Sequence, residues 1–153
     1  MPQTTPPEPA TVADVMRRDV VTVSPSASIR ELVRLLRKHQ ISGAPVVEDG
    51  RLLGTVSMSD VLWLGDARSL FAEDPTERAR AADQLDQRTV REIMSASIFG
   101  VEPDATLAEL ATFFARSALG RAIVHRDRVL LGIVSATDLI DLIAAQPGGG
   151  EGA

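Results

Sequence analysis

Two short segments of the sequence share the form Gly-x-x-Ser-x-x-Asp and carry residue types that can hold a sugar phosphate. They supply Ser57 and Asp60 after Gly54, and Ser135 and Asp138 after Gly132. Each segment follows a β-branched run and precedes an apolar helical pattern, which predicts a strand-to-helix junction. Free amides at a helix N-terminus and a serine hydroxyl attract a phosphate. A carboxylate offers two acceptors to the hydroxyls of a ribose, and the glycine leaves room for a ligand to approach.

The same spacing also predicts a purely structural role. Ser-x-x-Asp ahead of an apolar helix is a capping box, in which both side chains bond only to the main chain of their own helix. Recurrence in two places favours a ligand site, but a duplication also preserves a cap. Local chemistry therefore leaves both interpretations open.

The two segments belong to a repeat that organises most of the chain. An offset of 78 residues aligns residues 11–62 with residues 89–140 without a gap, and 17 of the 52 pairs are identical. Chance gives on the order of five identities, so the chain contains a duplication. One copy of about 50 residues buries too little surface to be stable alone, so we expect the two copies to pack face to face.

The hydrophobic pattern predicts an α+β fold with the order β-α-β-β-α in each copy. In the first copy we expect a helical turn at 11–16, strands at 20–23, 44–47 and 52–56, and helices at 29–39 and 57–64. In the second copy we expect strands at 98–101, 122–125 and 129–134, and helices at 106–117 and 135–145. The expected organisation is a flexible arm at 1–10, repeats at 11–64 and 89–145, a charged helical insert at 65–88, and a disordered Gly-rich tail at 146–153.

Composition excludes several classes of protein. The 153 residues carry a net charge of −5, which argues against a nucleic-acid partner, and they include no cysteine and only two histidines. His125 is expected at the surface. No apolar run approaches the roughly 20 residues of a membrane span, and the first residues do not form a signal peptide. We therefore expect a cytoplasmic protein. We also expect no enzyme activity, no catalytic cofactor and no metal site, because the sequence shows no nucleophile–base pair, metal cluster or phosphate loop.

With two further segments, the motifs resemble those of cystathionine-beta-synthase (CBS) domains. These segments are a valine-led opening that ends in methionine, at 12–16 and 90–94, and the run Ile-Ser-Gly-Ala-Pro-Val-Val at 41–47. The resemblance covers residues 11–64 and 89–145. It implies two modules paired about a pseudo-twofold axis, with clefts between them that hold AMP, ADP, ATP or a related adenosyl compound such as S-adenosylmethionine. It also implies a homodimer.

The resemblance implies specific contacts to such a ligand. Phosphate contact falls to Ser57 and Ser135, ribose contact to Asp60 and Asp138, and base contact to the neighbourhood of Thr22, Val23, Ala44 and Pro45. The remaining candidates are Gly43 in the first copy and Gly100, Arg121 and Ala122 in the second.

The two copies are unequal at these candidates. The first copy has Gly43-Ala44-Pro45 where the second has Arg121-Ala122-Ile123, and Gly100 replaces Thr22. Arg121 is suited either to a ligand phosphate or to plain solvation at a strand start. We expect the cleft built on the first copy to match the family better.

The sequence therefore predicts a regulatory module that binds an adenosyl ligand and signals by changing its packing or its contacts with an unidentified protein partner. The alternative is a ligand-free module for dimerisation or protein interaction, to which an acidic surface is also suited. Stabilisation by AMP, ATP or S-adenosylmethionine distinguishes the two.

Overall fold

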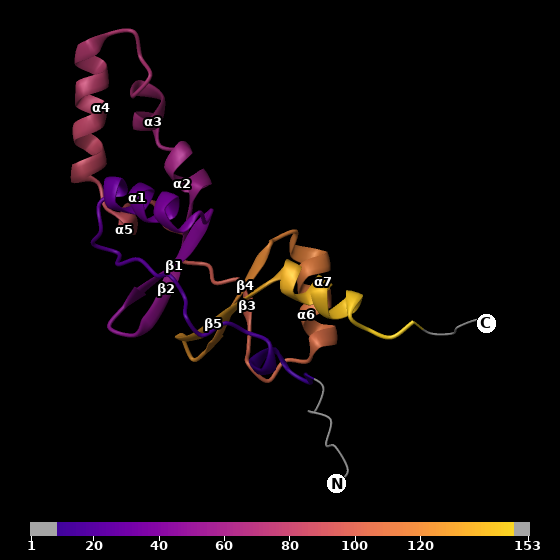
Figure 1. Ribbon diagram of the computed structural model, residues 1–153. Coiled ribbons are helices and arrows are strands. Elements are labelled where there is room, and N and C mark those ends of the chain that lie inside the picture. Colours follow the sequence, from indigo (N-terminus) through magenta and orange to yellow (C-terminus); the bar gives the residue numbers. More distant parts are fainter. Residues whose placement is uncertain (1–8, 149–153) are drawn as a thin grey trace. The chain divides into compact units, whose positions relative to one another are not determined.

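The chain folds into two compact units, each built around one copy of the repeat (Figure 1). The computed structural model describes residues 9–148. The first-copy unit consists of Val21–Ile98, and the second-copy unit combines the described residues up to Val20 with those from Phe99 onward. The opening segment of each copy therefore lies in the unit that holds the body of the other copy.

The first-copy unit contains a β-hairpin with helices on either side of it in sequence. Its elements are α1 (Ile29–His39), β1 (Gly43–Glu48), β2 (Arg51–Ser57), α2 (Met58–Leu62), α3 (Gly65–Ser69), α4 (Pro75–Gln87) and α5 (Val90–Ile93). Ser28 and Glu31 form a capping box that starts α1, and Gln40 ends the helix in the left-handed conformation at φ 53°. Strands β1 and β2 are antiparallel. Asp49 and Gly50 both have positive φ, at 52° and 77°, as a tight hairpin turn requires.

The second-copy unit repeats this plan. Its elements are the 3₁₀-helix η1 (Val12–Asp14), β3 (Gly100–Val101), α6 (Leu107–Ser117), β4 (Arg121–Arg126), β5 (Val129–Ser135) and α7 (Ala136–Ala144). Strand β4 pairs antiparallel with β5 and parallel with β3. Asp127 and Arg128 form the corresponding turn with φ of 51° and 62°. The α+β class predicted from the sequence is confirmed.

Each unit has its own hydrophobic core, and the opening segment of the other copy completes it. The first-copy core includes Leu32 and Val56 and is joined by Val90 from α5. The second-copy core includes Leu110 and Val134 and is joined by Val12 from η1. Val12 and Val90 are both fully buried. The opening segments are thus core elements and not linkers.

The strand predicted at 20–23 is wrong in extent, because only Val23 pairs, in a parallel bridge to Val46. The second copy has two parallel pairs at the corresponding place, Gly100 with Ile123 and the next residue along each strand. A Cβ on Gly100 would lie 2.2 Å from the carbonyl oxygen of Ile123. Thr22 and Pro45 stand where Gly100 and Ile123 do, and because Pro45 has no N–H, a ladder hydrogen bond needed for the second pair cannot form in the first copy.

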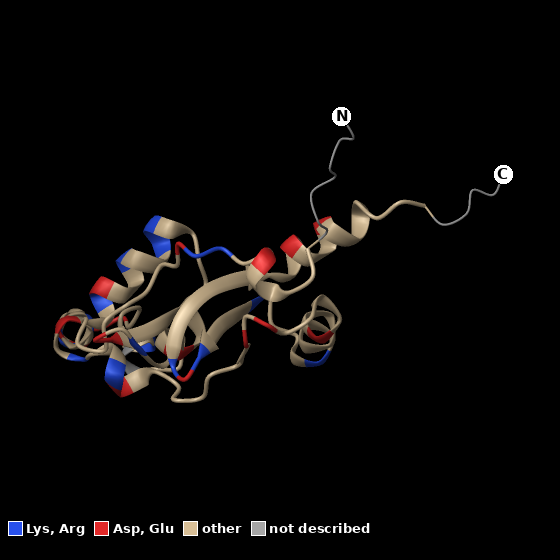
Figure 2. Cartoon of the chain, turned by 90° about the horizontal axis from the view of Figure 1, so that it is seen from below, with Lys and Arg blue, Asp and Glu red and all other residues tan. Residues whose placement is uncertain are grey.

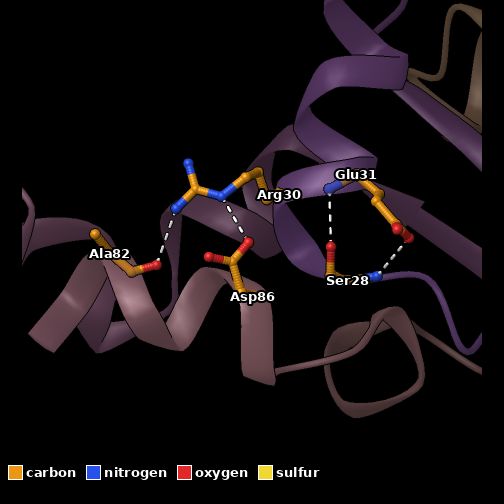
Figure 3. Close-up of polar contacts among 5 residues, drawn as sticks. All are labelled: Ser28, Arg30, Glu31, Ala82 and Asp86. Atoms are coloured by element: carbon orange, nitrogen blue, oxygen red, sulfur yellow. Dashed lines mark hydrogen bonds and ion pairs between the residues drawn. The ribbon is translucent and has the colours of Figure 1, made fainter.

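The insert between the copies is helical and is anchored on α1. Asp74 accepts a hydrogen bond from the amide of Thr76, and Pro75 occupies the first turn of α4. Helix α4 runs beside α3 (Figure 1). Arg30 of α1 bonds to Asp86 at 2.6 Å and to the carbonyl oxygen of Ala82 at 3.0 Å (Figure 3). The Arg30 hydrogen bond is the main cause that lowers the pKa of Asp86. This link belongs to the first-copy unit and has no counterpart in the repeat.

The charges of the described chain are mixed in sign. Figure 2 shows Asp and Glu residues interspersed among the Lys and Arg residues. Within the part of the chain that the structure describes, none of the helices has the length and apolar character needed to cross a bilayer.

Candidate functional site

The structure brings the first-copy candidates together at the open end of the β1–β2 hairpin. Gly43 at the start of β1 lies opposite Ser57 at the end of β2. On the other side of β1, the amide of Val23 donates to the carbonyl oxygen of Pro45 at 3.0 Å. Thr22, next to Val23, is exposed, whereas the side chains of Val23, Ala44 and Pro45 are buried. The seven candidates of this copy are Thr22, Val23, Gly43, Ala44, Pro45, Ser57 and Asp60.

The second-copy candidates converge in the same way. Arg121 at the start of β4 lies opposite Ser135 at the end of β5, in the position that Gly43 takes opposite Ser57. Arg121 is exposed and Ala122 is fully buried. The pairing of Gly100 with Ile123 places β3 beside this end of β4. Sequence positions far apart thus meet at one edge in each unit.

Both serine–aspartate pairs form capping boxes. In the first copy the amide of Ser57 donates to Asp60 Oδ2 at 2.8 Å, and the amide of Asp60 donates to Ser57 Oγ at 3.4 Å. In the second copy the amide of Ser135 donates to Asp138 Oδ2 at 3.2 Å, and the amide of Asp138 donates to Ser135 Oγ at 3.0 Å. The hydrogen bonds expected of a structural capping box are therefore present in both units. A ligand would have to share these side chains with the main chain.

The motif glycines have a different role from the one expected of them. A Cβ on Gly54 would lie 2.0 Å from the carbonyl oxygen of Ser95, and one on Gly132 would lie 2.7 Å from that of Arg17. In both units the main chain of the opening segment fills this space, because Ser95 pairs with Thr55 and Arg17 pairs with Ile133. The expectation that these glycines leave room for a ligand is wrong. They are needed for close approach of two main chains.

Arg17 is a residue at the second-copy motif that the sequence analysis missed. Its Nη2 donates to Asp138 Oδ1 at 3.3 Å. Partial burial raises the pKa of Asp138, but the hydrogen bonds from Ser135 and the charge of Arg17 outweigh this effect and lower it overall. Arg17 and Asp138 are 121 positions apart. The alignment of the copies pairs Arg17 with Ser95. This difference between the copies is the only feature of the sequence that could have drawn attention to Arg17.

An apolar groove of about 510 Å³ lies between α1 and α2 of the first-copy unit. Leu62 on its rim is 69% exposed, and the neighbouring Trp63 is 87% exposed. Ser57 and Asp60 do not line this groove. The lining residues are Val33, Leu36, Arg37, Gln40, Ile41, Ser42, Met58, Val61 and Leu62.

The two histidines and the acidic residues do not form a metal centre among the residues described. No group of three or more His, Asp or Glu side chains in this part of the chain is arranged to hold an ion. His125, which was expected at the surface, is only partly exposed, and its Nδ1 is buried without a hydrogen-bond partner among these residues.

Comparison with known proteins identifies the repeat. Residues 12–65 and 90–145 each match the family model for the CBS domain. The CBS domain-containing protein YhcV of Bacillus subtilis is 28% identical over 130 residues, which cover 85% of this chain and 83% of YhcV. Uncharacterized protein MJ1232 of Methanocaldococcus jannaschii is 26% identical over 136 residues, or 88% of this chain, but the chain spans only 40% of that relative.

A solved structure gives the same result for the fold. The CBS-pair protein CBSX2 of Arabidopsis thaliana is 25% identical and superposes with a TM-score of 0.69, over 88% of this chain and 94% of CBSX2. CBSX2 has also been solved in complex with AMP, and that structure superposes with a TM-score of 0.68. The family matches cover well over half of the sequence. The chain therefore belongs to the CBS domain family and carries two CBS domains in tandem.

Proposed function

We propose that this chain is a regulatory module that binds an adenine nucleotide or a related adenosyl ligand, and that its role is not catalytic. The observation that carries the proposal is the same pair of groups, a serine hydroxyl and an aspartate carboxylate, at a strand-to-helix junction in each unit. The complex of CBSX2 with AMP supports the ligand class, because CBSX2 shares the fold at 25% identity.

In this proposal the capping boxes hold the binding groups in place before a ligand arrives. Asp60 keeps Oδ2 on the amide of Ser57, and among the described residues Oδ1 accepts no hydrogen bond from another residue. That oxygen is available to a ribose hydroxyl. Ser57 Oγ donates to Asp60 Oδ2 at 3.2 Å, and its hydroxyl would have to rotate away from that oxygen to donate to a phosphate. A ligand alters packing or partner contacts only if it binds two arrangements of the module with different affinity.

Thermal unfolding with and without AMP, ATP and S-adenosylmethionine tests the proposal. A ligand at 100 times its dissociation constant adds about 2.7 kcal/mol to the free energy of unfolding. Asp60→Asn, which retains one oxygen for the Ser57 amide, is expected to weaken binding by about tenfold. Asp83→Asn on α4 removes the same charge away from the motif and serves as the control. No stabilisation by any of the three compounds would contradict the proposal.

The groove between α1 and α2 favours a second candidate function, a dimerisation module. Large exposed apolar side chains beside an apolar groove are typical of a protein interface, and a second copy of this chain is the occupant that we propose. Leu62→Asp is then expected to lower the average mass measured by sedimentation, whereas Val129→Asp, at the start of β5 in the other unit, is not. A wild-type chain that sediments as a monomer at all concentrations would exclude this function.

A further inference from the structure

The second-copy motif differs from the first in the charge that surrounds its aspartate. The main chain of Arg17 is fixed by two hydrogen bonds to Ile133, of 2.8 and 2.9 Å. The side chain of Arg17 is 73% exposed, while that of Asp138 is 22% exposed. The guanidinium thus stands on the solvent side of a carboxylate that is mostly covered.

Both oxygens of Asp138 are occupied within the unit. Oδ2 accepts from the amide of Ser135 at 3.2 Å, and Oδ1 accepts from Arg17 Nη2 at 3.3 Å. A ribose hydroxyl that binds Oδ1 must therefore share that oxygen with Arg17 or displace the guanidinium. Displacing a guanidinium from a carboxylate is unfavourable unless the guanidinium gains another anion.

The first-copy motif lacks this arrangement. Ser95 takes the place of Arg17, with its main chain bonded to Thr55. Gly43 lies opposite Ser57, where Arg121 lies opposite Ser135 in the second copy. Both differences add a cation to the second-copy motif, and neither adds one to the first.

We propose that Arg17 makes the second-copy motif selective for adenosyl ligands that carry a phosphate. A phosphorylated ligand gives the guanidinium an anion to replace Asp138 and frees Oδ1 for the ribose, whereas an uncharged nucleoside must compete with Arg17 for the same oxygen. Arg121, opposite Ser135 on β4, adds a second positive charge at the end of β5. This inference rests on the proposed function, since it concerns which adenosyl ligand the motif accepts.

Calorimetric titration with AMP and with adenosine tests this inference. Asp60→Ala, which removes both carboxylate oxygens from the first-copy motif, is introduced first, so that binding reports on the second-copy motif. In that background Arg17→Ser, which installs the serine of the first copy, is expected to weaken AMP binding about tenfold, the loss expected for a charge-assisted hydrogen bond. Adenosine binding should stay the same or become tighter. Arg18→Ser removes a neighbouring charge and is expected to change neither affinity.

Arg17→Lys separates charge from packing. It should retain most of the preference for AMP over adenosine, because it keeps a cation beside Asp138. Equal weakening of AMP and adenosine by Arg17→Ser, an unchanged preference, or a loss in Arg17→Lys as large as in Arg17→Ser would each overturn the assignment while leaving the proposed function intact. Failure of the wild-type chain to bind either compound would instead overturn the proposed function, and this inference with it.

Discussion

The two units have the same capping box and differ in what surrounds it. In the first-copy unit a glycine and a serine, Gly43 and Ser95, flank the motif, and in the second-copy unit two arginines take their places, Arg121 and Arg17. The residues that start the helix are therefore the same, whereas the residues that would face a ligand are not. Identity of a short motif in a duplicated protein shows that the local fold is retained and does not show that the two sites accept the same ligand.

Substitutions at core positions are expected to change the free energy of unfolding most, and they test whether the two units are equivalent. Leu32 and Leu110 correspond in the repeat and are both fully buried. Leu32→Ala and Leu110→Ala are each expected to lower the free energy of unfolding by about 2–5 kcal/mol, through lost burial and a cavity. Urea unfolding of the two variants measures this. A cost at one site alone would show that the two cores are not equivalent.

Substitution of the motif glycines is expected to change the free energy of unfolding by less, and by different amounts in the two units. Gly54→Ala is expected to cost about 3 kcal/mol, because its Cβ would meet a main-chain oxygen at 2.0 Å. Gly132→Ala is expected to cost about 1–2 kcal/mol, because its Cβ would meet the main chain at 2.7 Å and the flexible sulfur of Met16 at 2.8 Å. Gly120→Ala, with no atom within 4 Å of its Cβ, is the control. Equal costs at Gly54 and Gly132 would contradict the geometry described for the two crossings.

The ion pair of Arg17 with Asp138 should give a pH-dependent difference. The pKa of Asp138 is lowered in the folded chain, so its contribution to stability is present above the unfolded value of about 3.9 and is lost as the pH falls through the folded value. Arg17→Ser is expected to raise the pKa of Asp138 and to reduce stability at neutral pH by about 0.2–1 kcal/mol. Carboxyl NMR titration measures the pKa. A pKa that does not rise would mean that Ser135 alone sets it.

The insert gives the smallest expected effect, and only in the first-copy unit. Asp86→Asn weakens the link from Arg30 to α4, so trypsin should cleave α4 after Arg80 faster than in the wild-type chain. High salt should reduce the difference, because the pair is partly exposed. Glu73→Gln, just before the same helix, removes the same charge at a position that does not act on Arg30 and is the control. An unchanged cleavage rate would show that the apolar contacts of Ala81 and Leu85 hold the helix without the ion pair.

The sequence predicted well those elements that local rules determine. Helices α1 and α6 follow from helical periodicity together with the caps at Ser28 and Thr106, and the hairpins follow from alternating runs around short turns. The serine and aspartate of each motif were located correctly at the helix start. Whether they bind a ligand stays a prediction.

The sequence could not reveal the exchange of the opening segments. Val12 and Val90 are the same residue at corresponding positions, and either one satisfies the hydrophobic pattern of either core. The role of Gly54 and the pairing of Arg17 with Asp138 both depend on that exchange. Local patterns therefore left the glycines to be interpreted as room for a ligand and left Arg17 unassigned.

The placement of Val12 and Val90 has a consequence for how such a protein arises. A polypeptide with a single copy of the repeat would have an incomplete interior, which only a second identical molecule could complete by a mutual exchange of N-terminal segments. Joining two copies in one polypeptide makes this exchange intramolecular, at an effective concentration that is set by the linker and is independent of expression level. Severing the chain within residues 65–88 would restore that dependence, since each fragment would then need the other to complete its interior.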